Sequence, residues 1–167
     1  MPSDSKSRFS RAGSQTVNAA EGEVRLTDIG RRLGFHLKRA GLLSNNAYMR
    51  SASKYDVVSG HFGILEIVLD NPGINQRKLG EALGLDKSSI SPAVAKLEKR
   101  SLILRRPGPV RRSYELFITP LGESLLQSLR ACADEHEEKL AAPLSAEERE
   151  QLIQLLDRVF SHLARTL

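Results

Sequence analysis

The residues best able to do chemistry in this sequence are basic side chains concentrated in one short stretch. Between Lys87 and Arg112 the chain carries eight Lys or Arg residues and one acid, Glu98, for a net charge of +7. Such a basic surface attracts a polyanion: nucleic acid first, an anionic membrane second, with a solvated face as the alternative. From Asp134 to Glu150, seven acids stand against two basic residues, which predicts an acidic region elsewhere on the fold.

Patterns that would indicate catalysis are missing. The sequence has no Gly-x-Ser-x-Gly elbow, no Walker loop, no His-Glu-x-x-His motif and no dinucleotide-binding fingerprint. We therefore expect no enzyme activity, no cofactor and no metal site. Acids follow the single cysteine, Cys132, and disfavour a thiolate, so a buried inert cysteine is expected rather than an oxidation sensor. His136, beside two glutamates, is interpreted as part of an acidic solvated face rather than as a metal ligand.

Length and composition are those of an ordinary soluble protein. The 167 residues are 40% hydrophobic and 27% charged, which suits one domain, or one domain with an extension. No apolar run approaches the roughly 18 residues of a transmembrane helix, so no membrane association is expected. Residues 1–26 lack the apolar segment of a signal peptide, and the single cysteine fits a reducing cytosol, so we expect a cytoplasmic location. Because residues 1–26 are rich in Ser and hold few large apolar residues, we expect a tail that is disordered or ordered by a partner.

The basic stretch lies in a pattern typical of a helix-turn-helix. Asn75 and Asp86 can cap two helices, at 76–83 and at about 86–100. Gly84 stands between them, where a helix end favours a left-handed residue. A short helix, a tight turn and a second helix in this order predict a helix-turn-helix.

After this pair of helices the apolar pattern changes period and predicts a wing. Two short strands, at 102–106 and 113–118, are expected around a Pro-Gly-Pro turn. A hairpin directly after a helix-turn-helix is a wing, and Arg111 and Arg112 lie near the end of its loop.

Longer helices surround this lobe, and their predicted ranges are 28–53, 59–70, 120–140 and 146–166. Both long terminal helices carry apolar faces that a domain of about 80 residues cannot cover alone. We infer that a second copy of the chain covers these faces, which makes the protein a homodimer.

The chain resembles the MarR family of bacterial transcriptional regulators in two segments, NQRKLGEALGLDKSSISPAVAKLEKRSLILRR and RRSYELFITPLGE. The resemblance covers about residues 30–165. It implies a mainly α fold with a small β-hairpin wing: a winged helix-turn-helix lobe at 57–118 and dimerisation helices at 27–56 and 119–167. Many members of the family repress genes and release DNA on binding a small anion, often an aromatic acid, and some relatives respond to acyl-CoA thioesters.

The resemblance also assigns the candidate contacts to DNA. The helix at 86–100 would be the recognition helix, the wing arginines would enter or flank the minor groove, and the start of helix 76–83 would meet phosphate. The candidate DNA-binding residues are Gln76, Arg77, Lys87, Ser88, Ser89, Ser91, Pro92, Lys96, Arg111 and Arg112.

Three residues depart from the family pattern. Val110 stands where an aspartate usually helps to hold the wing, which is also about one residue short. Ser101 stands where the family often has glycine, so a left-handed backbone at this position would strain the serine. Pro92 removes an amide from the recognition helix: either it kinks the helix, or Ser91 and Pro92 form a cap and the regular helix begins late.

In the family, a ligand pocket lies between the first two helices and the DNA-binding lobe. The candidate effector-binding residues are His36, Arg39, Tyr48, His61 and Phe62. An anionic effector, an aromatic carboxylate or an acyl-CoA, would bind best to a cation and a few hydrogen-bond donors in an apolar cleft. The alternative is that His36 is a satisfied core histidine and Arg39 a surface charge.

The sequence therefore predicts a regulator that binds specific sequences in double-stranded DNA. We expect a repressor that a small anionic effector releases from a pseudo-palindromic operator. The alternatives are a winged-helix protein-interaction module without specific operator reading, and an activator or nucleoid-type binder, which its specificity ratio would distinguish.

Overall fold

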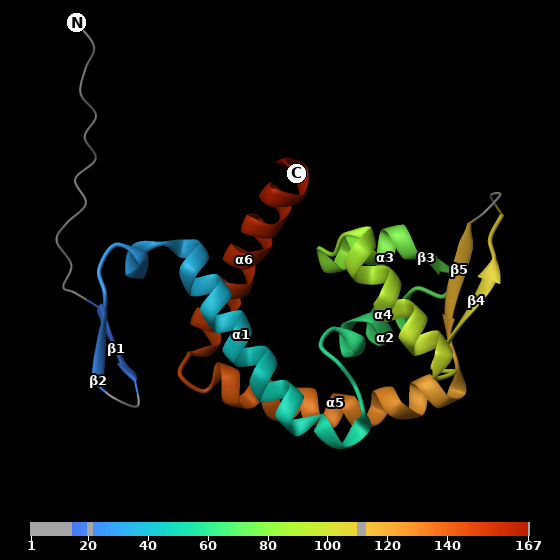
Figure 1. Ribbon diagram of the computed structural model, residues 1–167, viewed down its shortest axis with the longest axis horizontal. Helices are drawn as coiled ribbons and strands as arrows, with labels where there is room; N and C mark the ends of the chain where they lie inside the picture. The colour runs from blue at the N-terminus through green and yellow to red at the C-terminus, as the bar shows by residue number, and fades with distance from the viewer. Residues whose placement is uncertain (1–14, 20–21, 110–112, 167) are drawn as a thin grey trace, which may run out of the picture. The chain divides into compact units, whose positions relative to one another are not determined.

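A computed structural model describes residues 15–19, 22–109 and 113–166 of the chain (Figure 1). The chain divides into two compact units, Met1–Leu43 and Ser44–Leu167. The fold is mainly α-helical, with a small three-stranded antiparallel sheet in the second unit, which confirms the predicted fold class. None of the described helices is both long enough and apolar enough to cross a membrane.

The first unit contains a β-hairpin where the sequence predicts a tail. Strands β1 (Gln15–Ala19) and β2 (Gly22–Leu26) pair antiparallel, with Val17 opposite Val24. The expectation that residues 1–26 have no order of their own does not hold for these two strands. β-Branched residues at positions 16, 17 and 24 favour an extended backbone, and the two strands are close enough in sequence to pair locally.

The first long helix is shorter than predicted. Asp28 makes no capping hydrogen bond, and a 3₁₀ turn, η1 (Ile29–Arg31), takes the place of the expected first helical turn. Helix α1 then runs over Leu33–Ser51, and a second 3₁₀ turn, η2 (Ser53–Tyr55), follows it.

The helix-turn-helix forms as the capping residues predict. It comprises α3 (Gln76–Leu83) and α4 (Lys87–Lys99). The side chain of Asn75 accepts a hydrogen bond from the Lys78 amide at 2.9 Å, and Gly84 has a φ of 66° at the end of α3. These local interactions set the start and the end of α3, which is why the sequence alone locates it.

Two of the departures from the family pattern have structural outcomes. Helix α4 is regular from Lys87 and contains Pro92, so the alternative of a late start at Pro92 is wrong. Pro92 supplies no amide for the carbonyl of Ser88, one turn earlier in the helix. Ser101 has a φ of 57°, so it is left-handed and strained by about 1–2 kcal/mol.

The sheet joins the helix-turn-helix to the wing. Strands β4 (Ile103–Pro107) and β5 (Tyr114–Ile118) form the wing hairpin. A two-residue strand, β3 (Ile74–Asn75), pairs with the other edge of β5, with Ile74 opposite Leu116. Strand β3 was not predicted, since two residues are too few to show an alternating pattern.

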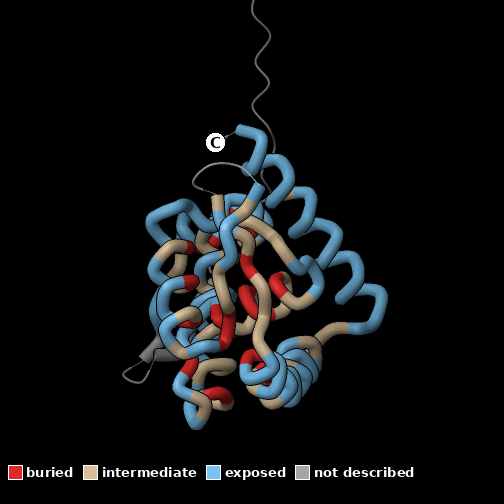
Figure 2. The backbone as a smooth tube through the Cα atoms, turned by 90° about the vertical axis from the view of Figure 1, so that its right-hand side faces the viewer, coloured by how far each residue is buried: buried red, intermediate tan, exposed pale blue. Residues whose placement is uncertain are grey.

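Helices α2 (His61–Asp70) and α5 (Pro120–Ala141) complete the core of the second unit, and α6 (Ala146–Thr166) follows. Figure 2 shows the buried parts of the chain gathered inside this lobe, with exposed segments around them. The largest fully buried side chains are Ile64, Leu65, Leu79, Leu97, Ile103, Leu116, Leu126, Leu129, His61, Val68 and Val94. Burial of each of the aliphatic ones contributes about 1.5–3 kcal/mol. This core holds α3, α4 and the wing strands as one body.

Candidate nucleic-acid interface

Helix α4 has a buried apolar side and an exposed polar side. Ile90, Val94 and Leu97 lie in the core. The candidate contacts on the exposed side are Lys87, Ser88, Ser89, Pro92 and Lys96. Hydroxyl and amine groups in these positions can bond base edges or phosphates in the major groove. The core therefore leaves the polar face of the predicted recognition helix open to a partner.

Asp86 organises the first turn of α4. Its carboxylate accepts hydrogen bonds from the amide of Ser89 and from the hydroxyl of Ser88, both at 2.8 Å. These bonds hold the pKa of Asp86 below its usual value. The Ser88 hydroxyl thus donates within the cap, and its lone pairs remain available to accept a hydrogen bond from DNA.

Two candidate contacts, Gln76 and Ser91, hydrogen-bond to each other. The side-chain amide of Gln76 donates to the hydroxyl of Ser91 at 2.6 Å. The bond joins the first residue of α3 to a half-buried residue of α4, fifteen residues later in the chain. Gln76 therefore orients Ser91, whereas Arg77 beside it is exposed and pairs with Glu81.

Two further arginines belong to the wing, and the predicted set does not include them. Arg106 lies with its guanidinium 4.7 Å from the centre of the Phe117 ring, and Arg105 stacks similarly on Tyr114. Arg105 also pairs with Glu98 at 3.2 Å, while Arg106 is exposed on β4. Exposure increases along β4 from Ile103 to Pro107. The place of Arg106 at the loop end of the predicted strand, within the basic stretch, is the signal that could have identified it as a candidate phosphate contact. Val110, Arg111 and Arg112 lie outside the described residues.

Tyr48 and Phe62, two candidate effector-binding residues, lie side by side. Their ring centres are 5.8 Å apart, and the ring of His136 on α5 is 6.0 Å from that of Tyr48. The Tyr48 hydroxyl is buried and has no hydrogen-bond partner among the described residues. Burial, with smaller effects of Cys132 and Glu66, raises the pKa of Tyr48 to about 12. The hydroxyl is therefore a neutral donor, and His136 is an effector candidate that the prediction does not include.

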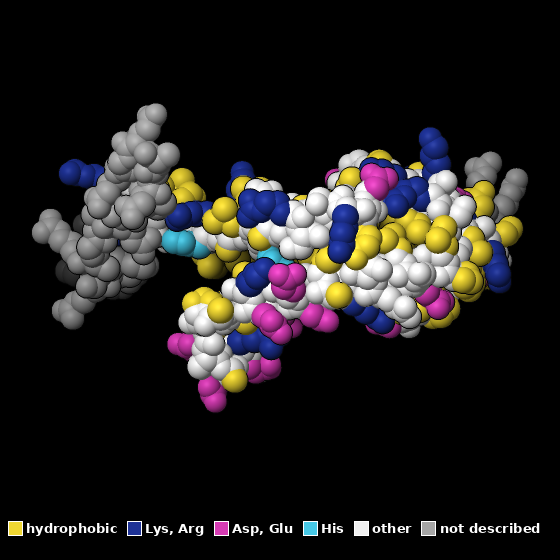
Figure 3. All heavy atoms as spheres, turned by 90° about the horizontal axis from the view of Figure 1, so that it is seen from below, with side chains coloured by type: hydrophobic (Ala, Val, Ile, Leu, Met, Phe, Trp, Pro, Cys, Tyr) yellow, Lys and Arg dark blue, Asp and Glu magenta, His cyan; other side chains and the backbone are white. Residues whose placement is uncertain are grey.

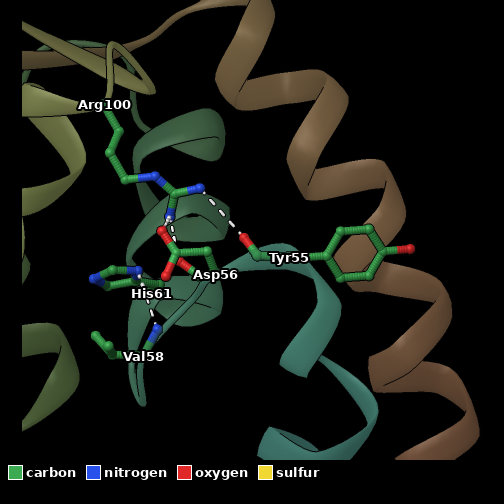
Figure 4. Close-up of polar contacts among 5 residues, drawn as sticks. All are labelled: Tyr55, Asp56, Val58, His61 and Arg100. Atoms are coloured by element: carbon green, nitrogen blue, oxygen red, sulfur yellow. Dashed lines mark hydrogen bonds and ion pairs between the residues drawn. The ribbon is translucent and has the colours of Figure 1, made fainter.

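His61 lies in a different environment. It is fully buried, and Asp56 and Arg100 lie near it (Figure 4). Burial, followed by the charges of Lys96 and Arg100, lowers the pKa of His61 to about 4. His61 is therefore neutral near pH 7 and cannot supply a positive charge to an anionic effector.

The remaining candidates, His36 and Arg39, belong to the first unit. His36 is exposed, and its Nε2 lies 2.7 Å from the carbonyl oxygen of Gly30. The alternative of a core histidine at this position is wrong, because α1 has no buried residue. Arg39 is half-buried on the same helix.

Cys132 and His136, the other residues with reactive or metal-binding potential, both contact groups of the fold. Cys132 is buried, with its sulfur 3.6 Å from the carbonyl oxygen of Ser51. His136 contacts the hydroxyl of Ser44 at 2.9 Å. Within the described residues, no group of three His, Cys, Asp or Glu side chains is placed to hold a metal ion. Figure 3 shows acidic side chains gathered where α5 meets α6, in agreement with the acidic stretch 134–150.

Comparison with known proteins gives the family. The model of the MarR family matches residues 59–112, the segment that contains α2, α3, α4 and the first wing strand, β4. A transcriptional regulatory protein for the hcr operon of Thauera aromatica is 35% identical over 136 residues, which are 80% of this chain and 82% of the relative. The chain belongs to the MarR family.

Solved structures of MarR-family regulators agree with this assignment. The transcriptional repressor CouR, bound to a 23-mer DNA duplex, is 27% identical with a TM-score of 0.74, over 83% of this chain and 99% of CouR. PcaV from Streptomyces coelicolor, in complex with its natural ligand, is 25% identical with a TM-score of 0.70, over 80% of this chain and 95% of PcaV. This MarR-family protein is thus a DNA-binding transcriptional regulator with a winged-helix fold, and not an enzyme.

Proposed function

We propose that the protein is a homodimeric repressor that binds a pseudo-palindromic operator and releases it on binding a small anion. The observation that carries the proposal is the exposed polar face of α4, held by a rigid core beside α3 and the wing strands. In a dimer, two such helices would enter successive major grooves about 34 Å apart. Arg111 and Arg112 would contact the minor groove or its phosphates.

The homodimer is supported by α6. None of its residues is buried, yet one side of the helix carries a row of large apolar side chains, each 40–49% exposed. The row consists of Leu152, Ile153, Leu155, Leu156, Phe160 and Leu163. A helix with such a stripe normally buries it against a neighbour, and a second copy of the chain would provide one.

The small anionic effector is supported by the cluster of Tyr48, Phe62 and His136. Two aromatic side chains and an unpaired hydroxyl donor suit an aromatic carboxylate or its CoA thioester, because the rings pack on a ring and the hydroxyl bonds an oxygen. PcaV, a relative of known structure, binds its natural ligand. The effector would act by favouring a spacing of the two recognition helices that does not fit the operator, with a coupling of about 1–3 kcal/mol.

The experiment is a fluorescence-anisotropy titration at near-physiological salt. The protein is added to a duplex from upstream of its own gene and to a scrambled duplex of the same composition. We expect a Kd at least a thousandfold lower on the upstream duplex, which is typical of a specific regulator. Equal, weak binding to the upstream and scrambled duplexes would contradict reading of an operator upstream of the gene and favour the interaction module.

Lys96 on the exposed face of α4 gives a sharper test. We expect Lys96→Gln to raise the Kd for the specific duplex about tenfold, since a lysine contact to a base or phosphate is lost. The matched control is Lys139→Gln, which removes a lysine that pairs with Glu135 on α5. Equal effects of the two substitutions would contradict the placement of α4 in the groove.

A further inference from the structure

The C-terminal end of α4 is fastened to a distant segment by one side chain. Arg100 follows the last residue of α4, and its guanidinium donates hydrogen bonds to the carbonyl oxygens of Asp56 and of Tyr55, the latter at 3.2 Å (Figure 4). The carboxylate of Asp56 lies 4.0 Å from the same group. These partners precede Arg100 by 44 and 45 residues. We call the contact of Arg100 with residues 55 and 56 the Arg100 joint.

The main-chain carbonyls, rather than the Asp56 carboxylate, carry the joint. The side chain of Asp56 is 86% exposed, so its ion pair with Arg100 is weak, whereas the Arg100 side chain is only 28% exposed. The planar guanidinium reaches two successive carbonyls at once, which the single ammonium group of a lysine does not reproduce. Arg100 therefore fixes the backbone of the segment after α1.

One residue of the Arg100 joint and the residue that follows Arg100 have an unusual backbone. Asp56 has a φ of 50° and Ser101, the residue after Arg100, has a φ of 57°. In the described part of the chain these are the two residues other than glycine with positive φ. Such conformations persist where the surrounding structure holds them, and they concentrate at functional sites.

The segment under the joint is fixed from the other side by the core. Ala52, Val57 and His61 are buried, and the Nδ1 atom of His61 accepts a hydrogen bond from the Val58 amide at 3.4 Å. Residues 52–60, which connect α1 to α2, thus have little freedom to move independently of α2. Arg100 adds the connection from this segment to α4.

Arg100 is not placed like a contact to DNA. Its donors point to the carbonyls of residues 55 and 56, and it lies beyond the last turn of α4, whereas the exposed serines and Lys87 lie in the first turns. A phosphate contact would require these donors to leave two backbone acceptors. The charge of Arg100 in the basic stretch therefore serves the fold of the recognition lobe.

We propose that Arg100 is a positioning residue for DNA recognition, which sets the direction of α4 by locking its end onto the segment that follows α1. The proposal rests on the proposed function, because it assumes that α4 reads a specific sequence. Loss of the joint would leave every contacting side chain in place but let α4 change its angle. Sequence-specific contacts need that angle, while phosphate attraction to a basic surface does not.

The test compares Arg100→Met, which keeps the aliphatic stem, with wild type. The duplexes are one that the wild-type protein selects from a random-sequence library and a scrambled version of it, each titrated at several KCl concentrations. We expect the Kd for the selected duplex to rise at least tenfold and the Kd for the scrambled duplex to change less than twofold. The slope of log Kd against log [KCl] on the selected duplex should stay the same.

Controls separate positioning from folding. Arg149→Met removes an exposed arginine on α6 that pairs with Glu137 on α5. Neither residue belongs to α4 or to the Arg100 joint, so this substitution should leave both Kd values unchanged. Arg100→Lys keeps the charge but not the planar guanidinium, so this variant should lose specificity while it stays folded. Thermal unfolding of the variant checks that it is folded. If Arg100→Met fails to fold, the Arg100→Lys variant alone tests the proposal, through the ratio of its Kd values for the scrambled and selected duplexes.

Three outcomes would overturn the proposal. An unchanged ratio of specific to non-specific Kd in the Arg100 variants would show that the joint does not position α4, while the proposed function would stand. A salt slope reduced by about one, with equal losses on both duplexes, would make Arg100 a phosphate contact. A wild-type protein that selects no duplex would remove the proposed function together with this inference.

Discussion

His61 illustrates how burial decides what a side chain can do. From its position at the start of a helix, the residue is a candidate cation for an anionic effector. In the fold it is fully buried at the first residue of α2, with Lys96, Arg100 and Asp56 as the charged groups that act on it. Burial is the largest cause of its lowered pKa, and the two cations act in the same direction.

The lowered pKa makes stability depend on pH in a defined window. Between a pKa of about 4 in the folded protein and about 6.5 in the unfolded chain, only the unfolded chain binds the proton. The contribution of His61 is therefore complete above pH 6.5 and is lost as the pH falls toward 4. From pH 7 to pH 5 we expect the free energy of unfolding to decrease by about 2 kcal/mol through this group.

Urea unfolding at pH 7 and pH 5 measures this dependence. The variant His61→Gln should lose most of it, at some cost in stability at pH 7, whereas His162→Gln, which changes an exposed histidine on α6, should retain it. An equal pH dependence in wild type and His61→Gln would mean that His61 is accessible to protons in the folded protein.

At the scale of elements, the junction of the wing with α5 depends on a close approach of backbones. The Thr119 hydroxyl caps α5 by accepting from the Gly122 amide at 3.0 Å, and it lies 2.7 Å from the carbonyl oxygen of Ser101, to which it donates. A Cβ atom at Gly122 would lie 2.1 Å from the carbonyl oxygen of Leu102. The first turn of α5 can therefore pack on the segment between α4 and β4 only because residue 122 is glycine.

We expect Gly122→Ala to destabilise the protein by at least about 1–3 kcal/mol, because the added methyl group would force α5 away from Leu102. The matched control is Gly41→Ala in α1, where an added Cβ meets nothing within 4 Å. That change should be neutral or stabilising by up to about 1 kcal/mol, since alanine favours a helix. Denaturant unfolding compares the two, and a neutral Gly122→Ala would contradict the tight packing at this junction.

At the scale of the whole molecule, the apolar stripe on α6 is a surface whose side chains one chain leaves 40–49% exposed. None of the residues of α6 is buried, and the capping box at Ser145 and Glu148 starts the helix as the sequence predicts. A dimer that buries this stripe would also place two recognition helices on one duplex, so assembly and operator reading should be lost together.

Leu156→Lys tests this link. We expect the substitution to shift the protein from dimer to monomer in sedimentation velocity and to raise the Kd for the specific duplex by at least a hundredfold. Gln154→Lys is the control, since it introduces the same residue on the opposite face of α6 and leaves the stripe intact. A Leu156→Lys protein that sediments like wild type would place the dimer interface elsewhere.

Elements whose ends depend on neighbours within a few residues can be located from the sequence alone. Asn75, Asp86 and Thr119 each accept a hydrogen bond from an amide three residues later, so the starts of α3, α4 and α5 could be predicted from spacing. The charge of the basic stretch is likewise a property of composition, and it indicated the polyanionic partner before any fold was known. The unpredicted hairpin of β1 and β2 is the exception, because low apolar content hid two short strands.

Only the tertiary structure decided which distant residues meet. The bond from Gln76 to Ser91, the contact of Tyr48 with His136 and the hold of Arg100 on residues 55 and 56 join segments that local spacing does not relate. The same holds for His61, whose residue type suggests a charge and whose burial removes it. The physical reason is that these properties depend on packing between elements, which many residues set together, whereas caps and periodicity depend on a few neighbours along the chain.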